Sequence, residues 1–159
     1  MRFVFDIDGT LCFDGRLIDQ TIIDTLLQLQ HDGHELIFAS ARPIRDLLPV
    51  LPSVFHQHTL IGANGAMISQ QSKISVEYNI DITAQNINKY TALQYIFDAD
   101  VKYIAFGNDH NDIFMLQHAS SGYIIGPSEA YTHAILKLDK IKHINNNTQA
   151  ICKVLKSYK

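Results

Sequence analysis

Charged residues are scarce in this chain of 159 residues. Lys, Arg, Asp and Glu make up 18% of it, whereas soluble proteins average about 25%. The formal net charge at pH 7 is −3, so no overall positive field attracts nucleic acid or an anionic membrane surface. We therefore expect neither a nucleic-acid nor a membrane partner. The low charge also leaves room for a surface through which copies of the chain associate.

Cysteine and long apolar runs are scarce as well. The two cysteines, Cys12 and Cys152, lie far apart without metal-ligand spacing, which argues against a disulfide framework and a zinc site. No stretch approaches the roughly 18 consecutive apolar residues of a membrane span. The segment MRFVFDIDG (1–9) enters a strand-like run directly and lacks the pattern of a signal peptide. From these absences we expect a cytoplasmic protein.

Hydrophobic residues are plentiful at 47%, enough for one compact domain with a core. Short apolar runs alternate along the chain with segments of helical apolar period. The expected strands are RFVFDI (2–7), ELIFAS (35–40), two strands around a turn in TLIGANGAMIS (59–69), KISVEY (73–78), VKYIAFG (101–107) and GYIIG (122–126). The expected helices follow Asp19, Pro43, Thr83, Asn111 and Ser128, with a last one near the C-terminus. This alternation predicts an α/β fold, a Rossmann-like parallel sheet with helices on both faces.

Polar residues gather where the expected strands end, which is where open α/β sheets bind ligands. Asp6 and Asp8 follow the first strand, and the turn at Gly9 allows both carboxylates to face one centre. Close like charges need a cation or a shared proton, and oxygen-only ligands favour Mg²⁺. Ser40 ends the second strand. The polar segment GNDHND (107–112) follows another strand, where it caps a helix, holds an ion, or does both.

These residue types together describe a site for phosphoryl chemistry. Acids that hold magnesium, a nearby hydroxyl and a lysine can offset the charge on a transferring phosphoryl group. A carboxylate can also attack phosphorus itself and form an aspartyl-phosphate, which divides one difficult step into two.

Five segments, in order, resemble motifs of the haloacid dehalogenase (HAD) superfamily of phosphatases. FDIDGTL (5–11) is similar to the DxDGT motif, and LIFASAR (36–42) resembles the second motif, a strand that ends in Ser or Thr. LIGANGAMI (60–68) resembles the NGA segment of the Cof-like, type IIB branch. NKYTALQYI (88–96) resembles its lysine motif, and GNDHNDIFML (107–116) its acidic GDxxND motif. The resemblance implies a three-layer HAD core and a HAD-like phosphatase.

The resemblance also implies roles for individual residues. Asp6 would be the nucleophile and a metal ligand, and Asp8 the general acid and then the base, with its backbone carbonyl on the metal. Ser40 would bond the phosphoryl group, and Lys89 would neutralise its charge and orient Asp6. Substrate-binding residues are expected at Arg42, Asn64, Gly9 and Thr10. The metal, Mg²⁺, is expected at Asp6, Asp8, Asn108 and Asp109, with Asp112 supporting it from outside the ligand shell.

Two departures from the family pattern leave alternatives open. Asn108 stands where the family has an acidic ligand, so either its amide oxygen or the neighbouring Asp109 completes the metal shell. Type IIB members also insert a cap domain before the lysine motif, whereas only residues 70–88 fill that interval here. We therefore expect a single domain over 1–159 with a minimal or absent cap. Either a large substrate or, as we favour, a neighbouring subunit would then cover the site.

The predicted function is that of a Mg²⁺-dependent phosphatase that hydrolyses phosphomonoesters through an aspartyl-phosphate at Asp6. Its expected substrates are sugar phosphates or other small phosphorylated metabolites. The alternative is a phosphate-binding or regulatory domain with little turnover, which Asn108 and the missing cap motivate. A receiver-type signalling domain fits poorly, because its phosphoacceptor follows a later, central strand.

Overall fold

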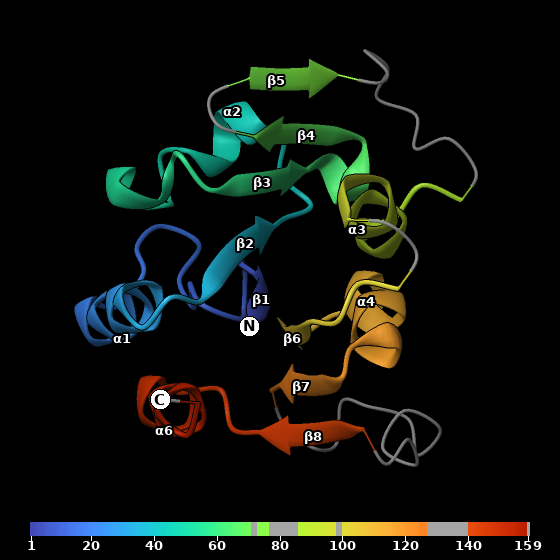
Figure 1. The fold of residues 1–159 in the computed structure, drawn as a ribbon. Coiled ribbons are helices and arrows are strands. Elements are labelled where there is room, and N and C mark those ends of the chain that lie inside the picture. The colour runs from blue at the N-terminus through green and yellow to red at the C-terminus, as the bar shows by residue number, and fades with distance from the viewer. Residues whose placement is uncertain (71–72, 77–85, 98–99, 127–139, 159) are drawn as a thin grey trace.

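The computed structural model describes residues 1–70, 73–76, 86–97, 100–126 and 140–158. In these residues one eight-stranded sheet runs through the middle of the molecule (Figure 1). Its strands are β1 (Arg2–Asp6), β2 (Glu35–Ala39), β3 (Thr59–Gly62), β4 (Met67–Gln70), β5 (Lys73–Val76), β6 (Ile104–Gly107), β7 (Ser121–Ile125) and β8 (Ile141–Ile144). Their order is β5-β4-β3-β2-β1-β6-β7-β8; β4 is antiparallel to both of its neighbours, β3 and β5, and the other neighbouring strands are parallel. The predicted α/β class with a mostly parallel sheet is confirmed.

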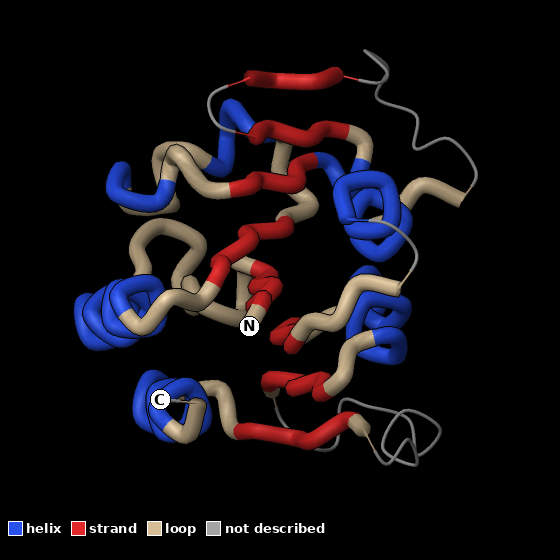
Figure 2. The backbone as a smooth tube through the Cα atoms, viewed as in Figure 1, coloured by secondary structure: helices blue, strands red, loops and turns tan. Residues whose placement is uncertain are grey.

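Helices cover both faces of this sheet, as the ribbon and the tube views show (Figures 1 and 2). The helices are α1 (Gln20–His31), α2 (Ile44–Leu47), α3 (Lys89–Phe97), α4 (Ile113–His118) and α6 (Thr148–Lys156). Short 3-10 turns lie at Ser53–Phe55, Ala63–Gly65 and His110–Asp112. Helices α1 and α6 pack side by side on one face, and α3 and α4 pack together on the other. None of the helices in the described ranges is long and apolar enough to cross a membrane.

The core has two parts because successive side chains of a strand point to opposite faces. A row of stacked rings runs across the central strands on the α1 side, with centroids 6.0 Å apart between Phe38 and Phe5, 5.1 Å between Phe5 and Phe106, and 4.8 Å between Phe106 and Tyr123. Val4 and its neighbours in β2 and β6 fill the other face beneath α3 and α4. This packing on both faces fixes β2, β1 and β6 and therefore the positions where these strands end.

The structure corrects the start of one expected helix and adds one strand. The helical period before residue 97 suggested a helix from Thr83, but residues 86–88 are not helical and α3 begins at Lys89. Strand β8 was not expected, because its alternating IKHI segment is short and half polar. The expected helix from Ser128 to Leu138 lies outside the described residues.

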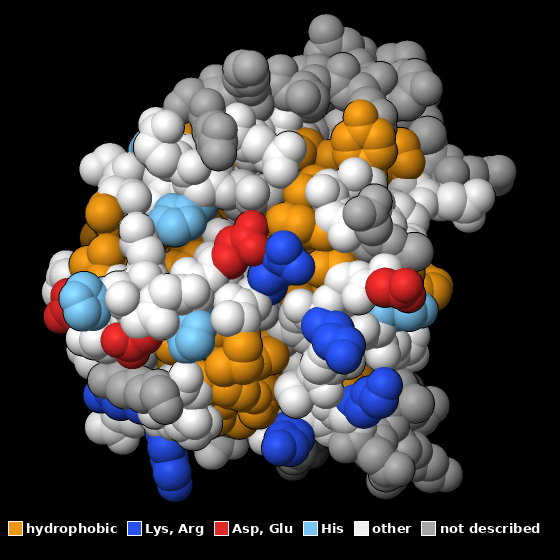
Figure 3. Space-filling model, viewed as in Figure 1, with side chains coloured by type: hydrophobic (Ala, Val, Ile, Leu, Met, Phe, Trp, Pro, Cys, Tyr) orange, Lys and Arg blue, Asp and Glu red, His pale blue; other side chains and the backbone are white. Residues whose placement is uncertain are grey.

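The surface agrees with the low charge of the sequence. On the face drawn in Figure 3, acidic and basic side chains lie as separate spots between hydrophobic and neutral surface. The largest exposed fractions among hydrophobic residues belong to Leu17 at 73% and Tyr95 at 67%.

Candidate active site at the strand ends

The carboxyl ends of β1, β2 and β6 meet at one edge of the sheet. These strands are parallel neighbours in the order β2-β1-β6, so the residues that leave them are adjacent in space. Asp6 ends β1, Ser40 follows β2, and Asn108 follows β6. Three of the five predicted motif segments are therefore brought together by the sheet alone.

The centre of the site is a buried ionic cluster of three side chains. Lys89 Nζ lies 2.5 Å from Asp6 Oδ1 and 2.7 Å from Asp112 Oδ1. The exposed fractions are 2% for Lys89, 5% for Asp6 and 0% for Asp112. Asp6 is also bonded through its second oxygen, because Thr10 Oγ1 donates to Asp6 Oδ2 at 2.9 Å. Asp6 and Lys89, predicted as nucleophile and charge partner, are thus in direct contact.

The cluster has one positive charge for two carboxylates. Burial and the charge of Asp112 raise the pKa of Asp6 to about 7, although Lys89 and the hydrogen bond from Thr10 act in the opposite direction. Burial alone would lower the pKa of Lys89, but the two carboxylates outweigh it and raise that pKa. The excess negative charge means that this place favours an additional cation.

Lys89 reaches the cluster because it is the first residue of α3. Asn88 caps that helix: its Oδ1 accepts hydrogen bonds from the backbone N–H of Tyr90 at 2.9 Å and of Thr91 at 3.0 Å. Thr91 Oγ1 in turn accepts from Asn88 N at 2.9 Å. The reciprocal bonds satisfy the free backbone donors at the start of the helix. The signal N-x-x-T was present in the sequence and could have located this helix start.

The polar segment 107–112 both caps a helical turn and supplies the buried carboxylate of the cluster. Asp112 Oδ2 accepts from the backbone N–H of Asn108 at 3.0 Å and of Asp109 at 3.1 Å. Asp109 Oδ1 accepts from His110 N at 2.6 Å and forms a capping box with Asp112. A Cβ at Gly107 would lie 2.6 Å from Asp112 Cβ, so only glycine allows this close approach.

Asn108 lies beside the DxDGT turn. A Cβ on Gly9 would lie 2.0 Å from Asn108 Nδ2, and Gly9 has a φ of +76°. Thr10 Oγ1 is 3.3 Å from Asn108 Oδ1. Of the two alternatives for the metal position, Asn108 therefore points to the β1 turn, while the carboxylate of Asp109 is used in a helix cap.

The carboxylate of Asp8 is held by Arg42. Arg42 Nε donates to Asp8 Oδ2 at 2.8 Å and Arg42 Nη2 donates to Asp8 Oδ1 at 2.6 Å, which is a bidentate pair. Nη2 also donates to the carbonyl of Gly15 at 2.9 Å. Within the described part of the chain, no hydrogen bond or ion pair joins Asp8 to Lys89, Asp6 or Asp112, so the Asp8 carboxyl group is separate from that of Asp6.

Ser40 and the turn around Asn64 are joined by hydrogen bonds next to the end of β2. Ser40 is buried, and its Oγ accepts a hydrogen bond from Arg42 N at 3.0 Å. The backbone N–H of Ala63 donates to Arg42 O at 2.8 Å, and that of Asn64 donates to Ser40 O at 3.1 Å. The expected Asn-Gly turn is found within this segment: Asn64 has φ 53° and ψ 29°, Gly65 has φ 109°, and the backbone N–H of Ala66 donates to Ala63 O at 3.2 Å, which is the geometry of a type I′ turn.

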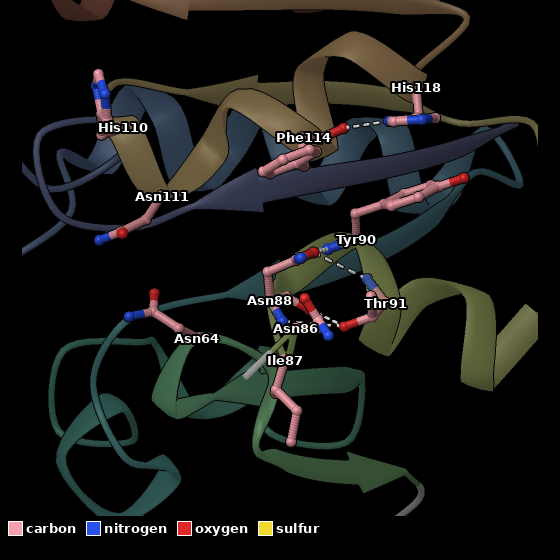
Figure 4. A pocket seen from close by; sticks show the side chains of 10 residues that line it. All are labelled: Asn64, Asn86, Ile87, Asn88, Tyr90, Thr91, His110, Asn111, Phe114 and His118. Atoms are coloured by element: carbon pink, nitrogen blue, oxygen red, sulfur yellow. Dashed lines mark hydrogen bonds between the residues drawn. The ribbon is translucent and has the colours of Figure 1, made fainter. Parts of the chain in front are cut away.

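A cavity of about 780 Å³ lies next to the ionic cluster (Figure 4). Its walls include residues that flank Lys89 in the chain and residues that directly precede Asp112. Four asparagines line it, namely Asn64, Asn86, Asn88 and Asn111. Three rings on α3 and α4 line it as well, those of Tyr90, Phe114 and His118, together with the ring of His110. Asn64 was predicted to bind substrate, but sequence analysis missed the rings, because their spacing is that of ordinary helix packing.

No three His, Cys, Asp or Glu side chains in the described ranges form a ready group of metal ligands. The oxygen donors at the strand ends include the Asp6 carboxylate and the Asn108 amide, both of which lie within hydrogen-bond distance of Thr10 Oγ1. Mg²⁺ is commonly bound by only one or two protein carboxylates together with water and phosphate oxygens. The donor set and the excess negative charge of the cluster therefore fit Mg²⁺.

The fold and the site define a Rossmann-like α/β protein with a buried carboxylate and lysine at the strand ends. A family model of haloacid dehalogenase-like hydrolases matches residues 3–78 and 73–155, so the chain belongs to that family and the predicted enzyme class is confirmed. The comparison with curated proteins found no match.

Solved structures of similar fold cover nearly the whole chain. A protein from Eubacterium rectale has a TM-score of 0.82 at 17% identity, with 99% of this chain and 98% of that chain covered. A HAD superfamily phosphatase from Bacteroides thetaiotaomicron has a TM-score of 0.77 at 14% identity, with coverages of 99% and 94%. A HAD subclass IIB sugar phosphatase has a TM-score of 0.70 at 15% identity, with coverages of 99% and 98%. These similarities show that the chain shares the fold of the three proteins.

Proposed function

We propose that this protein is a Mg²⁺-dependent phosphatase that hydrolyses small phosphomonoesters through an aspartyl-phosphate at Asp6. The observation that carries the proposal is the buried cluster of Asp6, Lys89 and Asp112 at the end of β1. A buried carboxylate next to a lysine is placed to attack an electrophile, while the lysine offsets the charge of the incoming phosphoryl group.

In the first half-reaction, one Asp6 carboxylate oxygen forms a bond to phosphorus, and the bond between phosphorus and the ester oxygen breaks. Protonated Asp8 gives its proton to the departing ester oxygen, which leaves as an alcohol. In the second, Asp8 takes a proton from a water molecule whose oxygen attacks the phosphorus. The bond between phosphorus and the Asp6 oxygen then breaks, which frees the Asp6 carboxylate and releases inorganic phosphate. Lys89 and the Ser40 hydroxyl would hold the phosphoryl group during both steps.

Asp8 has to change partner during this cycle. Its bidentate pair with Arg42 stabilises the ionised carboxylate, which is the form that accepts a proton from water. To act as the acid, Asp8 has to be protonated and released from Arg42. The freed guanidinium can then bind the substrate, which agrees with the substrate-binding role expected for Arg42.

The metal would be held by the Asp6 carboxylate, the Asn108 amide oxygen and the Asp8 carbonyl. Asp112 would support these ligands from outside the ligand shell. When bound, Mg²⁺ supplies positive charge that offsets the charge of the phosphoryl oxygens. Asp109 remains the alternative ligand if its cap opens.

Sugar phosphates are the first substrates to test, since one protein of similar fold is a sugar phosphatase. We further propose that the chain is a single domain without a full cap, because only residues 71–88 lie between β4 and α3. A second copy of the chain is then proposed to cover the site and exclude water.

The experiment is the hydrolysis of p-nitrophenyl phosphate with Mg²⁺ by wild type and by Asp6→Asn. Removing the nucleophile should abolish turnover, with a loss of at least about 10³-fold. Asp24→Asn is the matched control, because Asp24 is exposed on α1 and its carboxylate accepts a hydrogen bond from Gln20 at 2.8 Å. Undiminished activity of Asp6→Asn would rule out the mechanism. Binding of phosphate without turnover across a broad panel of esters would favour the regulatory alternative, which the Asp8–Arg42 pair motivates.

A further inference from the structure

We propose that the outer side of helices α3 and α4 is the surface through which two copies of this chain associate. This surface, the α3–α4 face, consists of the exposed and half-buried side chains of Tyr90, Gln94, Tyr95, Phe114, Gln117 and His118. The inference rests on the proposed function, in which a second copy covers the phosphatase site. It adds the place where that copy binds.

The α3–α4 face carries no exposed charge. Lys89 and Asp112 are the only Lys, Arg, Asp or Glu residues of α3, α4 and the 3-10 turn before α4, and both are buried. The helices on the other face of the sheet differ, because Asp24 of α1 and Lys153 of α6 are exposed. A surface helix ordinarily directs charged or polar residues to solvent. One helical layer of this protein therefore lacks the charge that the other layer has.

Aromatic rings occupy the uncharged face. Tyr95 and Phe114 have exposed fractions of 67% and 55%. Tyr90 stacks on His118 with ring centroids 3.9 Å apart, and His118 Nδ1 donates to Phe114 O at 2.8 Å (Figure 4). The two helices are thereby joined into one surface with fixed rings. Depletion of charge together with enrichment in Tyr and Phe is the composition that distinguishes the centre of a protein interface from other surface.

The α3–α4 face has hollows as well as protruding rings. The cavity of about 780 Å³ is lined from both helices, and a second cavity of about 320 Å³ lies between α3 and β4, with Tyr95 at its wall. A two-fold dimer joins the same surface of both copies, so each contact is made twice. A ring that protrudes from one copy can therefore enter a hollow of the other, and a face with both features is complementary to itself.

The distribution of charge favours a second copy as the occupant. Each chain has a net charge of −3, so two copies repel one another where their charged surfaces meet. The α3–α4 face brings no like charges together and offers none to a partner of opposite charge. The described exposed charges nearest to it along the chain are Asp109 before α4, and Asp100 and Lys102 after α3. They lie beyond the ends of the face, as in the polar rim of an interface.

The position of the α3–α4 face connects association with the site. Lys89 is the first residue of α3, and Asp112 directly precedes α4, so both helices begin at the ionic cluster. A copy that packs on these helices lies beside the strand ends that hold Asp6. It can therefore restrict the access of bulk water, which the short interval between β4 and α3 does little to prevent.

The first test measures the Kd of the dimer by light scattering and sedimentation at pH 8, where histidine side chains are ordinarily neutral. Tyr95→Glu and Phe114→Glu each place an unpaired charge in the interface of both copies, so the Kd should rise at least about 10²-fold. Val54→Glu is the matched control, because Val54 is 49% exposed in the 3-10 turn before β3. Its Kd should stay within about two-fold of the wild-type value.

The second test measures the dependence of the Kd on salt. An interface without ion pairs has no attraction for salt to screen, whereas the repulsion between two chains of net charge −3 is screened. Raising NaCl from about 0.05 M to about 0.5 M should therefore leave the wild-type Kd unchanged or lower it. A Kd that rises steeply with salt would assign the association to ion pairs elsewhere and overturn the α3–α4 face.

The outcomes also separate this inference from the proposed function. A mass of 18.0 kDa at every concentration would overturn the second copy as the occupant and leave the face to a different protein. Equal Kd values for Tyr95→Glu, Phe114→Glu and Val54→Glu would overturn the face itself. Asp6→Asn should dimerise like the wild type, because Asp6 lies outside the face. Hydrolysis that survives in Asp6→Asn would instead overturn the phosphatase mechanism and leave the dimer surface standing.

Discussion

At the scale of single residues, Lys89 is a buried cation between two buried carboxylates. Burying a carboxylate without a partner is costly, so the two acids and the lysine depend on one another. In sequence, Lys89 lies off the apolar stripe of its helix and looks like a surface lysine. In the structure Lys89 is instead buried, because the first turn of α3 directs its polar side toward the end of β1.

Replacing Lys89 tests this dependence. Lys89→Met would leave Asp6 and Asp112 without their cation, and we expect the free energy of unfolding at pH 7 to fall by about 3–5 kcal/mol. Phosphatase activity should fall at least about 10²-fold, because the charge opposite the phosphoryl group is lost. Urea denaturation and kcat/KM measure the two effects. Lys153→Met, at an exposed lysine of α6, is the control. Equal stabilities of the two variants would contradict the buried ion pairs.

Two single-residue variants test whether Asn108 or Asp109 is the Mg²⁺ ligand. If Asn108 is the metal ligand, Asn108→Asp adds a negative charge and should lower the Kd for Mg²⁺ by about ten-fold. Asp109→Ala should change that Kd little, although it removes a capping acceptor and costs about 1 kcal/mol of stability. Calorimetric titration with Mg²⁺ gives both values. The opposite pattern, with no effect at 108 and weak binding at 109, would assign the ligand to Asp109.

At the scale of elements, the start of α3 sets the position of Lys89, for which we propose a catalytic role. Asn88→Ala removes the cap of α3 and should destabilise the protein by about 1 kcal/mol. The variant should also lower kcat/KM by more than the loss of stability explains, because the cap at Asn88 positions Lys89, the next residue. Asn147→Ala removes the equivalent cap of α6, where Asn147 Oδ1 accepts from Ala150 N at 2.8 Å. Its stability loss should be similar and its activity unchanged. Equal activities in the two variants would contradict the positioning role of the α3 cap.

Most elements could be predicted from sequence because their signals are local. The continuous apolar run before Asp6 and the Asp19 cap before α1 each determine one element, and both are found where expected. Strand β8 lacked such a signal: of its four residues only Ile141 is buried, because the strand lies at the edge of the sheet. Edge strands have fewer neighbours to require apolar residues.

The site could be predicted in part for a related reason. Its segments follow strand ends, so parallel strand order brings Asp6, Ser40 and Asn108 together. The partners of the side chains could not be read from spacing. The pairing of Asp8 with Arg42 depends on how two loops approach, and the backbone of Ala63 and Asn64 depends on hydrogen bonds to the segment after β2. Those are tertiary contacts without a local pattern.

At the scale of the whole molecule, the short interval between β4 and α3 leaves little chain to cover the site and exclude bulk water from it. Covering the site of such a phosphatase excludes bulk water, which strengthens the electrostatic interactions with the charged phosphoryl group. Residues 71–88 are too few for a cap of several dozen residues, and exposed hydrophobic side chains such as Phe13 and Phe114 remain on the core. A second copy of the chain could supply the missing cover.

We therefore expect the protein to be an oligomer whose association and activity are linked. Light scattering should give a mass at least twice that of one chain, which is 18.0 kDa. Upon dilution to concentrations where the mass falls to that of one chain, kcat/KM for small esters should fall as well, because the uncovered site admits water and holds the substrate less firmly. Bovine albumin added at constant total protein controls for surface loss. A monomeric mass at every concentration, with constant activity, would assign the cover to the substrate itself, and larger phosphate esters should then be hydrolysed faster than small ones.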